Sequence, residues 1–298
     1  MAISTEQSRG HLAMLLFSAL VAGSFSLGVI VADEVAPVAL MAARFLIAGA
    51  VIGCFVAAGP GFRRRDFVAL WRYLILGGLF AGYFVLMFEG LKTAGAVSAA
   101  AVFTLTPLMS AGFGYVLLRQ ITTPRMAMAL SLAALAALWV IFRADIAAIR
   151  AFDIGRGEAI YFIGCILHAL YTPMVARLNR GESPVVFTFG MMVAGFVVLS
   201  IFGAGKIVQT DWMALPGIVW ITLFYISVFA SAATFVLLQY ATLRLPSAKV
   251  MAYTYLTPAW VILWQVALGN AWPAPLVLLG VGATVVALLI LLKDEATA

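Results

Sequence analysis

Two ionisable side chains lie inside long apolar runs of this sequence. His168 lies near the centre of the run 157–177, and Arg44 lies early in the run 37–57. Ionisable groups are costly inside a membrane, so they usually face a cavity or a partner there. Because histidine titrates near neutral pH, it can bind a substrate or take up a proton during a transport cycle. We predict that His168 faces a cavity. The alternative is a neutral histidine hydrogen-bonded to a neighbouring helix.

Arg44 calls for a different prediction. A long basic side chain near the end of a membrane span can extend its charged group to the surface. We expect Arg44 to do this, or to pair with a backbone carbonyl near the outer surface, rather than to touch a substrate.

Hydroxyl and aromatic side chains inside the runs form a second set. Tyrosines offer both stacking area and a hydrogen-bonding group, and residues three or four apart share a helix face. His168 and Tyr171 have such spacing, and so do Tyr253 and Thr257. Interhelical hydrogen bonding is the alternative role for each of these groups. The predicted substrate-binding set is His168, Tyr171, Tyr83, Tyr253, Thr257, Ser18, Ser24, Thr106, Ser231 and Thr234.

The elements that must position these residues are membrane spans. Of 298 residues, 65% are hydrophobic and 10% are charged. Apolar runs of about 20 residues, the length that crosses a bilayer as a helix, recur along the chain. The sequence therefore predicts an all-α integral membrane protein with ten transmembrane helices. The expected spans are 12–32, 37–57, 72–91, 96–118, 124–143, 157–177, 184–204, 217–240, 246–267 and 274–293.

Lysine and arginine in the short connections predict the orientation. Alternate connections are basic, and positive connections stay in the cytoplasm. The cations on that side are Arg9, Arg63, Arg64, Arg65, Arg72, Arg119, Arg125, Arg177, Arg180, Arg244, Lys249 and Lys293. We therefore expect both termini to be cytoplasmic and the protein to lie in the inner (plasma) membrane. Because the cations are spread over connections rather than gathered on one face, nucleic acid is not an expected partner.

Internal repetition divides the chain into two halves. Leu-Thr-Pro at 105–107 recurs at 256–258, and Ala-Pro-Val at 36–38 is followed at a similar separation by Ser-Pro-Val at 183–185. Two copies of five spans, 1–146 and 147–298, account for both recurrences. Because five is odd, the second copy must cross the membrane in the opposite sense. Inverted repeats are typical of carriers that open alternately to either side of a central site.

The two repeated prolines lie near the centres of equivalent spans. A proline removes one backbone hydrogen bond and disturbs the preceding turn. We predict that Pro107 and Pro258 are hinges at the level of a central cavity. The alternative is a static kink that helps the helices to pack.

The residues around these prolines resemble a known family. The relevant stretches are "APVALMAARFLIAGA" (36–50), "GLKTAGAVSAAAVFTLTPLMSAGFGYVLLRQITT" (90–123) and "YATLRLPSAKVMAYTYLTPAWVILWQVALGNAW" (240–272). They are similar to the drug/metabolite transporter superfamily, specifically its ten-helix EamA-type members. The resemblance implies an inverted five-plus-five bundle in which spans 1, 3, 4, 6, 8 and 9 surround a central cavity. It further implies the branch that exports amino acids, including aromatic amino acid exporters of the YddG type.

The expected substrate is a small neutral or zwitterionic metabolite, above all an amino acid, that alternating access carries outward. The interior holds no cluster of Lys or Arg for strongly anionic substrates, and the first span holds no carboxylate with which to exchange cations. An exporter of drug-like cations or nucleosides is the alternative, and a passive channel is a second one. Because no metal-binding, phosphate-binding or catalytic motif is present, we expect neither an enzyme nor a metal or other cofactor. The expected partners are the small-molecule substrate and the lipid bilayer, and the expected functional unit is a monomer.

Overall fold

Proline residues begin four of the long helices. Pro37, Pro124, Pro184 and Pro275 stand at the first helical position, where the missing amide proton costs nothing and the fixed φ suits a helix. Short polar connections precede these prolines. The starts expected from the sequence for these four helices therefore agree with those observed to within one residue.

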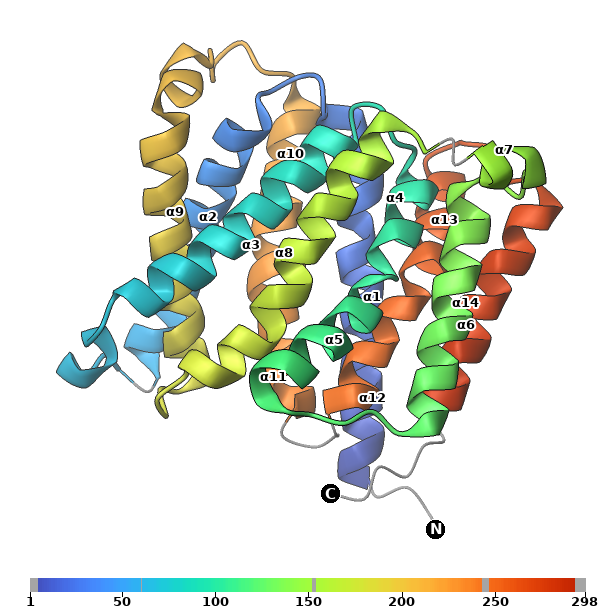
Figure 1. The fold of residues 1–298 in the computed structure, drawn as a ribbon. Coiled ribbons are helices and arrows are strands. Elements are labelled where there is room, and N and C mark those ends of the chain that lie inside the picture. Colours follow the sequence, from blue (N-terminus) through green and yellow to red (C-terminus); the bar gives the residue numbers. More distant parts are fainter. Residues whose placement is uncertain (1–4, 60, 152–153, 243–246, 293–298) are drawn as a thin grey trace.

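The computed structural model describes residues 5–59, 61–151, 154–242 and 247–292, and every regular element within them is helical (Figure 1). The first half contains α1 (Thr5–Val31), α2 (Pro37–Ala58), the 3-10 turn η1 (Arg64–Phe67), α3 (Trp71–Gly90), α4 (Ala96–Phe103), α5 (Thr106–Leu118) and α6 (Pro124–Ile141). A short helix, α7 (Ile146–Ala151), follows. The second half contains α8 (Arg156–Leu178), α9 (Pro184–Gln209), α10 (Gly217–Ser227), the π-helical turn η2 (Val228–Ala233), α11 (Thr234–Thr242), α12 (Ser247–Ala252), the 3-10 turn η3 (Tyr253–Leu256), α13 (Thr257–Ala267) and α14 (Pro275–Leu292).

Three of the predicted spans are not single α-helices. The fourth is divided into α4 and α5, and the ninth into α12, η3 and α13; in both, the break lies just before the repeated proline. The eighth contains the π-turn η2. In the described part of the chain, nine helical stretches are long and apolar enough to cross a membrane. The divided ninth span supplies the remaining crossing.

The contacts between helices repeat with a shift of five spans. Helix α3 packs on α8, and its counterpart, α10 with α11, packs on α1. In the same way α5 contacts α8 and α13 contacts α1, while α3 contacts α9 and α10 contacts α2. Helices α2 and α9 are counterparts in the two halves and contact each other, and so do α6 and α14. The bundle therefore has internal two-fold pseudo-symmetry, and because five is odd, the second half is inverted.

The outer face of the bundle is apolar. Large hydrophobic side chains point away from the protein, among them Phe202, which is 86% exposed. Buried positions, in contrast, include Arg44, Arg72 and many serines and threonines. This distribution suits a bundle surrounded by lipid, because lipid tails solvate apolar side chains and polar groups need partners inside the protein.

The basic connections lie at one end of the bundle. The connections α2–α3, α5–α6 and α8–α9, the start of α1 and the end of α14 all lie at the lower end in Figure 1. These connections carry most of the cations on which the predicted orientation depends. Arg244 and Lys293 lie outside the described residues, and so does the side chain of Lys249.

A buried ion pair joins the first half to the second at this basic end. Arg72 Nη2 lies 2.6 Å from Glu182 Oε1, and the two side chains are only 1% and 5% exposed. Arg72 also donates to the carbonyl of Leu178 at 2.6 Å. Partial burial opposes ionisation of Glu182, but hydrogen bonds from Arg72 and from the Arg180 backbone amide outweigh it and hold the pKa of Glu182 below its usual value.

We expect Glu182→Gln to lower the free energy of unfolding by about 3 kcal/mol, because it leaves the buried Arg72 cation uncompensated. Since the folded-state pKa of Glu182 is depressed, its contribution is present at neutral pH and disappears as the pH falls below the ordinary glutamate range. Thermal unfolding of the purified protein at pH 7 and at pH 3 measures both effects. Glu89→Gln is the matched control, since Glu89 forms a half-exposed pair with Lys92 and should contribute less than about 1 kcal/mol. Equal effects of the two substitutions would contradict the role of the buried pair.

Candidate functional site

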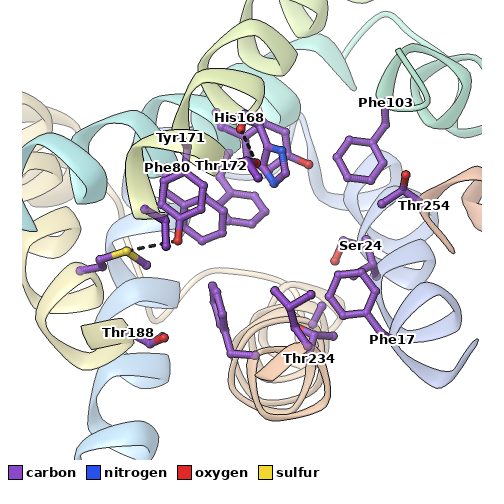
Figure 2. A pocket seen from close by; sticks show the side chains of 18 of the residues that line it. Phe17, Ser24, Phe80, Phe103, His168, Tyr171, Thr172, Thr188, Thr234 and Thr254 are labelled. Carbon is purple, nitrogen blue, oxygen red and sulfur yellow. Dashed lines mark hydrogen bonds between the residues drawn. The ribbon is translucent and has the colours of Figure 1, made fainter. Parts of the chain in front are cut away.

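A cavity of about 410 Å³ lies between the two halves of the bundle (Figure 2). Its wall includes residues of α1, α2, α3 and α4 from the first half and of α8, α9, α11 and α12 from the second, together with η2 and η3. Spans 2 and 7 thus contribute to the wall in addition to the six spans that the resemblance implies. The cavity lies where two inverted repeats meet, which is where such carriers hold their substrates.

The repeated prolines leave two backbone carbonyls beside this cavity without their helical partners. Pro107 has no amide proton to donate to the carbonyl of Phe103, four residues earlier, and Pro258 has none for Thr254. Phe103 and Thr254 both line the cavity, and Figure 2 labels both on its wall. The interruptions of the two equivalent spans therefore lie at the depth of the cavity.

His168 faces the cavity, as Figure 2 shows. Its Nδ1 atom has no hydrogen-bond partner among the described residues. The ring instead contacts aromatic rings, with centroids 4.6 Å from Tyr83 and 5.6 Å from Phe103. The hydrogen bond to a neighbouring helix that we gave as the alternative is not present in this state, and Nδ1 is a buried polar atom without a partner among the described residues.

Aromatic rings from α3 and α8 form one side of the cavity. Phe80 stacks on Tyr171 with centroids 4.9 Å apart and an interplanar angle of 20°. Phe84 meets Phe80 edge-on at 4.7 Å and meets Tyr83 at the same distance. The Tyr171 hydroxyl donates to the sulfur of Met191 at 3.2 Å. This aromatic wall offers a flat apolar group extensive contact area.

The prediction for Arg44 is wrong as to its location. Arg44 is 1% exposed and lines the cavity instead of reaching the membrane surface. Its Nε donates to Ser231 Oγ at 3.0 Å and its Nη2 donates to the carbonyl of Ala230 at 3.2 Å. The guanidinium carbon lies 3.6 Å from the centroid of the Phe84 ring. The expected pairing with a carbonyl does occur, but in the protein interior.

The π-turn η2 supplies the groups that hold Arg44. A π-turn inserts a residue into the helix and changes which amide each carbonyl meets, and such turns are frequent at functional sites. Ser231 donates to the carbonyl of Ile226, five residues earlier, at 2.8 Å, so its oxygen is oriented to accept from Arg44. The irregularity in the eighth span thus fixes a cation at the cavity wall.

Five of the ten predicted binding residues line the cavity, namely Tyr83, His168, Tyr171, Ser24 and Thr234. The other five, Tyr253, Thr257, Ser18, Thr106 and Ser231, are buried elsewhere. Tyr253 is hydrogen-bonded to His11 at 2.8 Å, and Ser18 accepts from the indole of Trp260 at 3.0 Å. In this conformation these two hydroxyls join α1 to the ninth span, which is the interhelical role.

Several wall residues were not predicted. They include Arg44, Phe80, Phe84, Phe103, Thr172, Thr188, Phe235 and Thr254. Phe103 and Thr254 had a readable signal, because each stands four residues before a repeated proline. The other phenylalanines carry no such signal, because phenylalanine side chains of a membrane helix can face either the lipid or the cavity.

The cavity extends toward the basic end and is closed at the other. Its wall reaches Ala176 in the last turn of α8 and Thr188 near the start of α9. At the opposite end Phe25 contacts Phe103 and Tyr161 with centroids 5.9 Å away from each. All three rings are at most 3% exposed. These rings block passage toward the end of the bundle that carries few cations.

Comparison with known proteins agrees with the architecture. Residues 8–142 and 155–293 each match the EamA-like transporter family. The chain belongs to this family. The predicted division at 146–147 lies in the link between the two matched stretches. This EamA-type protein is therefore a multi-pass membrane transporter of the drug/metabolite superfamily.

Two relatives extend the comparison. The protein is 25% identical over 269 residues to the uncharacterised transporter YyaM of Bacillus subtilis (strain 168), a match that covers 87% of this chain and 86% of that protein. A solved crystal structure is similar with a TM-score of 0.68 and 20% sequence identity over 97% of this chain and 96% of the other. That likeness concerns the fold.

Proposed function

We propose that this transporter exports small neutral or zwitterionic metabolites with an apolar group, above all aromatic and other neutral amino acids, by alternating access. The observation that carries the proposal is the cavity between the inverted halves. At about 410 Å³ it is within the range of small-molecule sites. It combines the aromatic wall with hydroxyls and with the imidazole of His168, whose Nδ1 has no partner among the described residues.

The closed and open ends of the cavity support a rocking mechanism. Rings of Phe25, Phe103 and Tyr161 close one end, while the wall of the cavity extends to Ala176 and Thr188 at the basic end. Since the two halves share one architecture in opposite senses, exchanging their conformations would close the basic end and open the other. The positive-inside rule favours a cytoplasmic location for the basic connections. In that orientation the cavity of the described state opens toward the cytoplasm.

Transport into proteoliposomes tests this function. Vesicles preloaded with unlabelled phenylalanine should take up labelled phenylalanine saturably, with and without a pH gradient. A response to the gradient would point to proton coupling, with His168 as the first residue to replace. Flux that does not saturate would indicate a channel, and flux of a cationic drug or nucleoside without amino-acid flux would overturn the substrate class.

The role of the aromatic wall in substrate binding can be tested by replacing Tyr171. Tyr171→Ala removes the ring that stacks on Phe80, and losing one aromatic contact of about 1.4 kcal/mol should raise the apparent KM for phenylalanine roughly tenfold. Phe202→Ala is the matched control, since Phe202 faces away from the protein and its loss should leave the KM unchanged. An unchanged KM in Tyr171→Ala would contradict the assignment of this wall to substrate.

A further inference from the structure

A buried guanidinium without a carboxylate partner lies on the cavity wall. Among the described residues the ion pairs are Arg9–Glu6, Arg72–Glu182 and Lys92–Glu89, so Arg44 takes part in none of them. Burying a charge is costly unless it is paired. Since Arg44 is 1% exposed, its charge is held in place at a cost that a bound anion would offset.

The guanidinium also has spare donors. An arginine carries five N–H groups. Nε–H donates to Ser231 and Nη2 to the carbonyl of Ala230, while Nη1 reaches only the sulfur of Met41 at 3.9 Å, which is a weak acceptor. At least two N–H groups therefore have no acceptor among the described residues. A carboxylate oxygen can accept from them, since guanidinium and carboxylate have matching planar geometry.

The aromatic wall continues directly from this cation. Phe84 lies under the guanidinium at 3.6 Å and meets Phe80 at 4.7 Å, and Phe80 in turn stacks on Tyr171. All of these residues line the same cavity. A ligand with its carboxylate at Arg44 can therefore lay an apolar or aromatic group along this wall.

The same wall offers no negatively charged group to pair with the ammonium group of a ligand. Among the described residues, those that line the cavity include no aspartate and no glutamate. Aromatic faces and hydroxyls remain, but they supply no full counter-charge. The wall therefore supplies a counter-charge for the carboxylate of an amino acid but not for its ammonium group.

We propose that Arg44 binds the carboxylate of the substrate and that the substrate class is apolar or aromatic monocarboxylates, whether or not they carry an amino group. This inference rests on the proposed function and revises its substrate class: amino acids are accepted as carboxylates, monocarboxylates without an amino group are admitted, and neutral solutes without a carboxylate are excluded. Amines of the same size and shape are rejected, because they would place a second cation beside Arg44. One cation suits a monoanion better than a phosphate dianion.

The test compares three ligands of one shape on the unmodified full-length protein. Phenylalanine, 3-phenylpropionate and 2-phenylethylamine differ only in which charged groups they carry. Displacement of labelled phenylalanine from the detergent-purified protein should give 3-phenylpropionate an affinity within about threefold of phenylalanine, and 2-phenylethylamine an affinity at least roughly 30-fold weaker, the factor expected for a charge-assisted hydrogen bond. Equal displacement by the amine, or no displacement by 3-phenylpropionate, overturns the proposal.

Variants assign this selectivity to Arg44. Arg44→Met should reduce the preference for 3-phenylpropionate over the amine by roughly 30-fold, and Arg44→Lys should retain part of it because the charge remains without the planar fork. Arg72→Met is the matched control. Arg72 is also 1% exposed but pairs with Glu182 away from the cavity, so its loss should lower stability and leave the ligand preference unchanged. The same preference in Arg44→Met as in the wild type overturns the assignment even if the protein transports amino acids.

Binding and transport measurements together distinguish failure of the carboxylate site from failure of the proposed export. If the purified protein prefers the carboxylates and proteoliposomes exchange no amino acid, the carboxylate site stands and the proposed amino-acid export fails. If exchange occurs without any preference for a carboxylate over the amine, the export stands and the role of Arg44 is overturned.

Discussion

Replacing Gly77 with alanine should prevent most of the protein from reaching a transport-competent fold. A Cβ atom at this position of α3 would lie 2.6 Å from the backbone nitrogen of Gly195 and 2.7 Å from the carbonyl oxygen of Met191 in α9. Backbone atoms cannot rotate away as the tip of a side chain can, so the two helices would have to separate. Overpacking in a core typically costs 1–3 kcal/mol, and we expect at least about 3 kcal/mol here. The yield of monodisperse purified protein and its melting temperature measure the effect.

Gly78 provides a control one residue away on the same helix. Apart from the adjacent backbone of its own helix, a Cβ atom there meets no atom within 4 Å. Because alanine restricts the unfolded chain more than glycine does, Gly78→Ala should leave stability unchanged or raise it by about 0.5–1 kcal/mol. If Gly77→Ala were as stable as Gly78→Ala, close contact between α3 and α9 would not be a requirement of the fold.

The spans and their order could be predicted because they depend on local properties. Apolar runs of sufficient length, separated by charged connections and prolines at helix starts, define membrane helices with little help from tertiary structure. The interruptions of the fourth and ninth spans could be predicted for the same reason, since Pro107 and Pro258 act on the turn that precedes them. Helix α1 begins earlier than expected, at Thr5 rather than residue 12, because a helix can continue beyond its apolar run.

Which face of each helix lines the cavity could be predicted only in part. In a soluble protein the apolar stripe identifies the buried face. In a membrane both lipid and protein interior accept apolar side chains, so this signal is lost. The ninth span illustrates the result: the chemistry of Tyr253 and Thr257 predicts that they bind substrate, but the neighbouring Thr254 lines the cavity instead.

The environment of Arg44 could not be predicted from the residues near it in the sequence. Its oxygen acceptors belong to Ala230 and Ser231, in a π-turn far along the chain. Nothing in the composition of 217–240 distinguishes a π-turn from a regular helix. If such acceptors are not known, the lowest free energy is expected for a lone arginine that extends its charged group to the membrane surface.

Replacing either repeated proline with alanine should slow transport more than it weakens substrate binding. Alanine at 107 restores the amide that can donate to the carbonyl of Phe103, and alanine at 258 does the same for Thr254. Each restored hydrogen bond stabilises a continuous helix by about 1 kcal/mol. If the break must bend in every cycle, that amount is added to the barrier and lowers the maximal rate roughly fivefold. The dissociation constant should change less than about twofold, since the proline rings themselves do not line the cavity.

Exchange at saturating phenylalanine and equilibrium binding of the same ligand separate these effects. Pro124→Ala is the control, because Pro124 stands at the exposed start of α6, where an amide has no helical partner to restore. The double variant Pro107→Ala with Pro258→Ala should lose roughly 25-fold in rate if the two breaks bend independently, and little more than a single variant if one break limits the cycle. Comparable losses in rate and affinity, or no loss in either, would mean that the prolines shape the resting structure without acting as hinges. A rate effect alone would locate the moving parts at the two positions where the inverted halves interrupt their helices beside the cavity.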